Sequence, residues 1–192
     1  MMRRLLLLGL LPVLLTVGCA RAGASGPQAA SLRASGSTSA PVSRDAAIYA
    51  VVLRRYLTTP GENSSLDFKT VFVFDYADVN AADPMRTAKS DKAVPISAAD
   101  QRSVAAALSD VAPVHFVASR DSVVIGGKDG CAVVRDNGIL VLLGLPTVAG
   151  GQMQVGINGF VACLGATWFT YVVAQNGDGW VVTGKTGPAA IS

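Results

Sequence analysis

The spacing of apolar residues predicts two amphipathic helices in the chain. The first has a stripe at i, i+3, i+4, i+7 and i+8, made by Tyr49, Val52, Leu53, Tyr56 and Leu57. Ser43 is a suitable N-cap for this helix, and the run TTPG at residues 58–61 ends it. The second begins at Ser97, with Asp100 in the capping-box position, and buries Val104, Ala107, Leu108 and Val111.

Alternating β-branched and aromatic residues predict strands in much of the remaining chain. Residues 69–75 (KTVFVFD) place Phe72 and Phe74 on one face and Val71 and Val73 on the other. Further strands are expected at residues 114–117, 122–125, 132–134, 139–143, 152–157, 167–174 and 180–183. The motifs DNG at 136–138 and NGDG at 176–179 are hairpin turn signals, and the polar residues 76–95 predict a long loop.

This order of elements predicts one α+β domain over residues 43–192. Two helices from the N-terminal half would pack on one face of a curved, mainly antiparallel sheet, because no helical pattern separates the late strands. The strand TWFTYVV (167–173), a Gly/Asp turn and GWVVT (179–183) together resemble the last hairpin of small exported domains with cystatin-like or NTF2-like sheets. The resemblance implies the curved sheet and implies no activity.

The start of the chain has the pattern of an export signal. Two arginines are followed by 13 mainly apolar residues (5–17), fewer than the roughly 20 that span a bilayer as a helix. The next segment, Leu15-Thr16-Val17-Gly18-Cys19, resembles the bacterial lipobox, although Thr16 stands where leucine is usual. That resemblance implies a signal peptide over residues 1–18 and a diacylated Cys19. Two alternatives remain: cleavage after Ala22, which releases a soluble protein, and an uncleaved anchor.

Residues 19–42 are rich in Ser, Ala and Gly and predict a flexible tether. The formal charge of +3 is concentrated in the leader and tether, because the chain from Arg44 onward holds 12 Lys and Arg against 13 Asp and Glu. The domain therefore has no basic excess for nucleic acid.

The three cysteines are informative about compartment. If Cys19 is acylated, Cys131 and Cys163 are the remaining thiols. In an oxidising compartment such a pair commonly forms a disulfide, the alternative being two separate buried thiols. No CxxC motif is present.

Candidate chemistry is sparse. His115 is the only histidine, and it lies in a strand-like run without a second metal-ligating pattern, so no metal or cofactor is predicted. Asp75, Asp78, Asn80 and Asp83 form one acidic cluster, in which solvated turn-forming side chains are favoured over a Ca²⁺ site. The run GGKDG at 126–130 is a turn and lacks the P-loop pattern. Trp168, Tyr171 and Trp180 are aromatic groove candidates, with core packing as the alternative.

Together these features favour a membrane-anchored extracytoplasmic lipoprotein that acts as a non-enzymatic binding or accessory module. Its sheet or its 76–95 loop would meet a protein or small-molecule partner, and the lipid on Cys19 would meet the membrane. One alternative is an envelope-acting hydrolase that uses His115 or the Asp75/Asp78/Asp83 group. Another is a purely structural envelope component.

Overall fold

A computed structural model of the chain describes residues 41–63, 68–86, 88–127, 130–177 and 179–192. The signal peptide, Cys19 and all but the last two residues of the tether lie outside the described residues. The helices and strands that follow all belong to the part of the chain after Ser39.

Helix α1 (Arg44–Thr58) forms where the apolar stripe predicts it. The Ser43 side chain accepts a hydrogen bond from the Ala46 N–H at 3.1 Å, which satisfies one of the free donors at the helix start. All five residues of the predicted stripe are buried. The backbone becomes extended at Thr59, just before Pro60.

Helix α2 (Ala98–Ala107) begins with the predicted cap. The Asp100 N–H donates to the Ser97 side chain at 3.1 Å. Val104 and Leu108 are fully buried, and Val111 is partly buried. Ala107, which was expected in the buried stripe, is exposed. The helix ends there, and the Ala107 carbonyl accepts a hydrogen bond from Arg54 at 2.6 Å.

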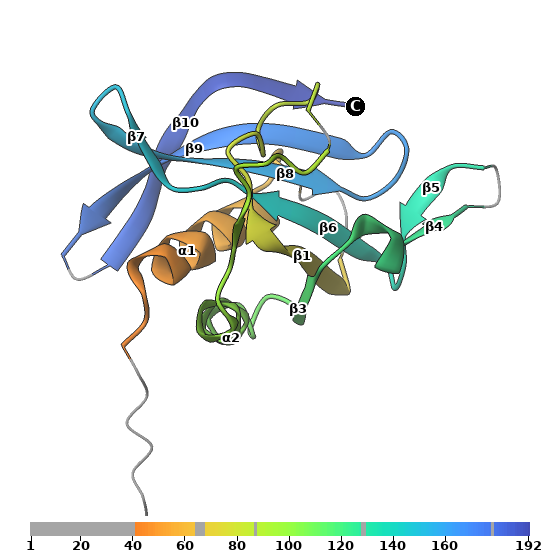
Figure 1. Ribbon diagram of the computed structural model, residues 1–192, viewed down its shortest axis with the longest axis horizontal. Coiled ribbons are helices and arrows are strands. Elements are labelled where there is room, and N and C mark those ends of the chain that lie inside the picture. Colours follow the sequence, from red (N-terminus) through yellow and green to blue (C-terminus); the bar gives the residue numbers. More distant parts are fainter. Residues whose placement is uncertain (1–40, 64–67, 87, 128–129, 178) are drawn as a thin grey trace, which may run out of the picture. The chain divides into compact units, whose positions relative to one another are not determined.

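The main sheet is mixed and mainly antiparallel, and with the two helices it makes an α+β domain (Figure 1). Its strands run in the order β10-β9-β8-β6-β1, with β2 and β3 both paired to β1 and β7 paired to β8. Their bounds are β1 Thr70–Ala77, β2 Val94–Pro95, β3 Val114–Val117, β6 Gly138–Leu143, β7 Thr147–Ala149, β8 Gln152–Phe160, β9 Ala166–Asn176 and β10 Gly179–Ile191.

Strand β1 departs from the expected antiparallel pairing. It runs parallel to β3 and to β6, with Val71 opposite Val114 on one side and Ile139 on the other. Helix α2 lies in the chain between β1 and β3 and supplies the long crossover that a parallel pair needs. Strand β1 also extends to Ala77, and β2 pairs with its end, so the loop predicted at 76–95 is shorter and covers residues 78–93.

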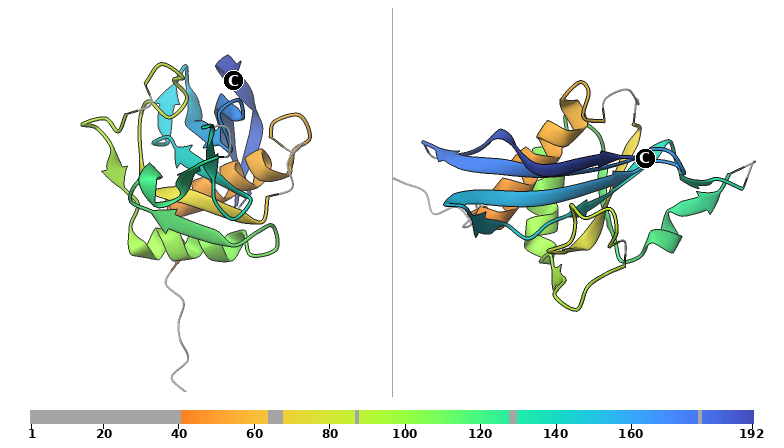
Figure 2. Two further views of the ribbon diagram at one scale, coloured as in Figure 1. Left: turned by 90° about the vertical axis from the view of Figure 1, so that its right-hand side faces the viewer. Right: turned by 90° about the horizontal axis from the view of Figure 1, so that it is seen from above.

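A short 3₁₀ turn, η1 (Arg120–Ser122), and strand β4 (Val124–Gly126) replace the single strand predicted at 122–125. Strand β4 pairs with β5 (Ala132–Val134) in a separate two-stranded sheet, which projects from the main sheet in Figures 1 and 2. Asp136 and Asn137 form a turn with φ of 60° and 49°. This turn links β5 to β6 in different sheets, so the predicted hairpin there is wrong, whereas NGDG does join the antiparallel pair β9 and β10.

Alternate side chains of the sheet enter two separate clusters. Odd-numbered residues such as Val73, Val141 and Ile157 join the buried side chains of both helices in the larger cluster. Even-numbered Phe72 and Leu140 belong to a smaller cluster with Val123 and Val134. Because successive residues of a strand point to opposite faces, the even-numbered face is available for something other than helix packing.

Candidate functional site

A cavity of about 580 Å³ lies on the even-numbered face of the main sheet, and we call it the sheet cavity. Its floor comes from four adjacent strands, β1, β6, β8 and β9. The floor residues are Phe74, Tyr76, Leu140, Leu142, Asn158, Phe160, Ala166 and Trp168, with Ser192 beside them. Its volume falls in the range of about 300–1,000 Å³ that is typical of small-molecule sites.

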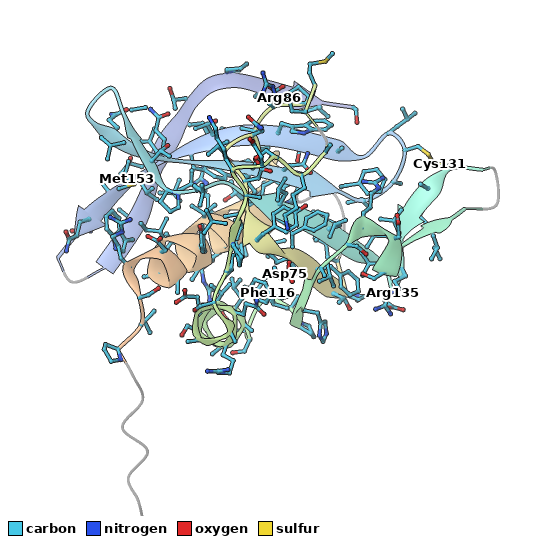
Figure 3. All side chains as sticks on the ribbon, viewed as in Figure 1. Asp75, Arg86, Phe116, Cys131, Arg135 and Met153 are labelled. Atoms are coloured by element: carbon cyan, nitrogen blue, oxygen red, sulfur yellow. A yellow bond between two sulfur atoms is a disulfide. The ribbon has the colours of Figure 1, made fainter. Side chains whose placement is uncertain are left out.

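Two segments outside the floor complete the sheet cavity. Ala81, Arg86 and Lys89 come from the 78–93 loop, which joins β1 to β2. Ala118 and Ser119 precede η1, and Arg120 is its first residue. Arg86, which lies on this loop, is labelled in Figure 3. The lining thus includes three cationic side chains, and no Asp or Glu side chain belongs to it.

Two of these cations lie over aromatic rings of the floor. The Lys89 ammonium is 4.0 Å from the centre of the Tyr76 ring, and the Arg120 guanidinium is 3.9 Å from the centre of the Phe160 ring. Within the described residues neither cation forms an ion pair, whereas Arg86 Nε lies 3.3 Å from Asp83 Oδ2. Ring contacts of this kind orient a cation while leaving part of its charge for another partner.

Asp78 closes the base of the 78–93 loop. The residue is 1% exposed, and its carboxylate accepts hydrogen bonds from the Asn80 N–H at 2.9 Å, the Ser90 N–H at 2.7 Å and the Ser90 hydroxyl at 2.9 Å. Burial by itself raises the pKa of this carboxyl, but the hydrogen bonds and the charge of Lys89 outweigh burial and lower the pKa. Asp78 therefore holds together the loop that carries Arg86 and Lys89.

The residues proposed for hydrolysis do not converge. His115 is exposed on β3, where its ring lies 6.0 Å from that of Phe72. Asp83 accepts the Met85 N–H at 2.9 Å and faces Arg86. Asp75 is half-buried on β1. Neither His115 nor any of Asp75, Asp78 and Asp83 lines the sheet cavity.

The three aromatic residues that were candidates for a groove do not line one common surface. Trp168 lines the sheet cavity, whereas Tyr171 is buried on the opposite face of the same strand. Trp180 on β10 packs against the larger core cluster. Strand alternation, which separates positions 168 and 171, explains why a single groove cannot use all three.

Cys131 and Cys163 form a disulfide, with Cα atoms 5.5 Å apart (Cys131 is labelled in Figure 3). A disulfide is typical of an oxidising, extracytoplasmic compartment. Beside it lies a second cavity of about 600 Å³, which we call the disulfide cavity, with Leu164 and Ile191 exposed at its border. Of the GGKDG run near Cys131, Gly126 ends β4 and the Gly127 N–H donates to the Cys131 carbonyl at 2.6 Å, whereas Lys128 and Asp129, the centre of the predicted turn, lie outside the described residues.

Glu62 is a residue that the sequence patterns did not single out. It lines the disulfide cavity, yet its side chain is 4% exposed. The Tyr171 hydroxyl donates to its carboxylate, and Arg55 Nη2 and Lys185 Nζ lie 3.1 Å and 3.2 Å from Oε1. Burial raises its pKa, but these partners outweigh burial and lower the pKa. The only local signal was that Glu62 is the single glutamate of the chain.

Comparisons with protein-family models, with curated proteins and with solved structures give no match to this chain. Neither helix in the described part of the chain is long and apolar enough to span a membrane. Among the same residues, no group of three or more His, Cys, Asp or Glu side chains is arranged to hold a metal ion.

Proposed function

We propose that the protein is a membrane-anchored, extracytoplasmic binding module that holds a small ligand in the sheet cavity. The observation that carries the proposal is a cavity of about 580 Å³ with four aromatic side chains in its floor and the 78–93 loop at its side. Binding sites of this kind combine an apolar lining with a few placed polar groups. Both helices would cover one face of a curved sheet and leave the opposite face to the ligand.

The location forms the second half of the proposal. The Cys131–Cys163 disulfide supports an extracytoplasmic domain. The lipobox-like segment supports acylation of Cys19, and two or three acyl chains would anchor the protein durably. Residues 20–42 would then act as a tether between the membrane and the domain.

Ligand binding is tested with the neutral fluorescent probe N-phenyl-1-naphthylamine. Its fluorescence rises when it enters an apolar site, so we expect a saturable rise with the native protein. Ala118 is exposed and lines the sheet cavity, and Ala118→Trp should abolish most of the rise by filling part of the cavity. Ala174→Trp is the matched control, since Ala174 is exposed on β9 and lines neither cavity. Equal binding by both variants would contradict the proposal.

Anchoring is tested separately by mass spectrometry of the mature N-terminus. We expect a diacylated or triacylated Cys19, and we expect Cys19→Ala to leave the membrane fraction. An unmodified chain that starts at Gly23 would instead support ordinary cleavage after Ala22 and release of the protein.

A further inference from the structure

Positive charges are concentrated at the sheet cavity, although the domain as a whole carries nearly equal numbers of positive and negative charges. From Arg44 onward, cationic and anionic residues are nearly equal in number, at 12 and 13. The sheet cavity nevertheless has Arg86, Lys89 and Arg120 in its lining and no acidic side chain. Because cations in a cleft with apolar walls reinforce one another's potential, this arrangement favours an anion over a neutral or cationic ligand.

The three cations differ in how much of their charge is engaged. Arg86 is paired with Asp83, and its side chain is 67% exposed. Lys89 lies over Tyr76, close enough to Asp78 to lower the pKa of that carboxyl. Arg120 has no ion-pair partner among the described residues. Arg120 is therefore the cation best placed to receive the charge of a ligand.

The position of Arg120 also suits recognition of an acid. Its guanidinium lies over Phe160, a ring of the cavity floor, which orients the planar group beside the apolar surface. A guanidinium that stacks on a ring still presents N–H donors at its edge, and these donors match the paired oxygens of a carboxylate, sulfonate or phosphate. The floor at the same time offers Trp168, Phe74 and Leu142 to an apolar body.

We propose that the ligand of the sheet cavity is a small amphipathic organic acid, with its apolar body against Trp168 and Phe74 and its acidic group on Arg120 and Lys89. This inference rests on the proposed function, because it names the class of ligand for the same cavity. The cavity volume of about 580 Å³ suits a single-ring, fused-ring or short aliphatic acid.

A matched pair of probes tests the inference. 1-Anilinonaphthalene-8-sulfonate has the same ring system as N-phenyl-1-naphthylamine and adds one sulfonate. We expect the sulfonate probe to bind about tenfold more tightly than the neutral probe, which corresponds to about 1.4 kcal/mol. We expect this advantage to fall as the salt concentration rises, because screening weakens the contribution of partly exposed charges.

Variants at two arginines test which side chain causes the preference for the anionic probe. Arg120→Gln should remove most of the preference for the anionic probe. Arg102→Gln is the control, because Arg102 is exposed on α2 and lines neither cavity, and it should leave the preference unchanged. If neither probe binds the native protein, the proposed function itself fails. If both bind with equal affinity, or if Arg120→Gln leaves the preference intact, only the assignment of an organic acid is overturned.

Discussion

The buried carboxylate of Glu62 provides a sharp test of how this fold is stabilised. Glu62→Gln keeps the size and shape of the side chain and removes its charge. The side chain is 4% exposed, and its carboxylate joins α1, β9 and β10 through Arg55, Tyr171 and Lys185. The substitution therefore weakens three connections between elements that are distant in the sequence.

The expected loss of stability follows from the ion-pair distances of Glu62 and from the exposure of its partners. At an effective dielectric constant of about 20, each ion pair at this separation contributes roughly 5 kcal/mol of Coulomb attraction. The several kcal/mol needed to dehydrate the carboxylate cancel much of this attraction, and the side chains of Arg55 and Lys185, which are 45% and 43% exposed, are screened by water. We expect a net loss of about 2–3 kcal/mol in the free energy of unfolding at pH 7.

The pH dependence distinguishes the charge from the shape of the side chain. The pKa of Glu62 is lowered in the folded protein, so its contribution is present above the unfolded value of about 4.3 and is lost as the pH falls through the folded value. The difference between the native protein and Glu62→Gln should therefore be largest at pH 7 and should shrink below about pH 4.

Urea unfolding followed by tryptophan fluorescence, at neutral and at acidic pH, measures this difference. Asp91→Asn removes a carboxylate at an exposed position of the 78–93 loop and serves as the control, with an expected change within about 0.5 kcal/mol. An equal loss for Glu62→Gln at both pH values, or a variant as stable as the native protein, would refute the reasoning.

Three further predictions concern other contacts of the fold. A methyl group at Gly159 would lie 2.7 Å from Cζ of the buried Tyr56. Gly159→Ala should therefore lower the free energy of unfolding by about 1–3 kcal/mol, as measured by urea unfolding. An unchanged urea midpoint would argue against this packing. Asp78→Ala removes three hydrogen bonds at the base of its loop. We therefore expect faster proteolysis within residues 79–93 and weaker binding of the probe in the sheet cavity. An unaltered cleavage rate would show that other contacts hold the loop. Replacement of Cys131 and Cys163 by serine should lower the free energy of unfolding by about 3–4 kcal/mol, and a reductant should then have no effect on the variant.

Local patterns predicted the elements of this fold well. Ser43 and Ser97 cap the two helices as expected, and the alternation of Val71, Phe72 and Val73 divides β1 between two clusters. These features depend on residues only a few positions apart, whose spacing matches the periods of a helix or a strand. The extra strands β2 and β7 were missed, because β2 has two residues and one of them is Pro95, and β7 has three residues with Pro146 directly before it and two glycines directly after it.

The candidate site was only partly predictable. The sequence predicted a candidate binding loop at residues 76–95, of which 78–93 are loop in the structure, and it gave Trp168 as a candidate groove residue. Arg120 lies in a polar segment without a recognisable motif. Glu62 follows a turn whose sequence predicts only the end of a helix. Each acquires its role from partners on other elements, so no local pattern could identify it.

The sequence by itself determined both helices with their N-caps, most of the longer strands and the turn between β9 and β10, and it shows that the chain begins with an export-like pattern. Only the tertiary structure decided that β1 lies parallel to β6 and β3, and that the 78–93 loop and η1 bring Lys89 and Arg120 to one cavity. The physical reason is the distance along the sequence over which each effect acts. Propensity and periodicity act over a few residues, whereas strand order and register are chosen by burial of side chains from across the whole domain.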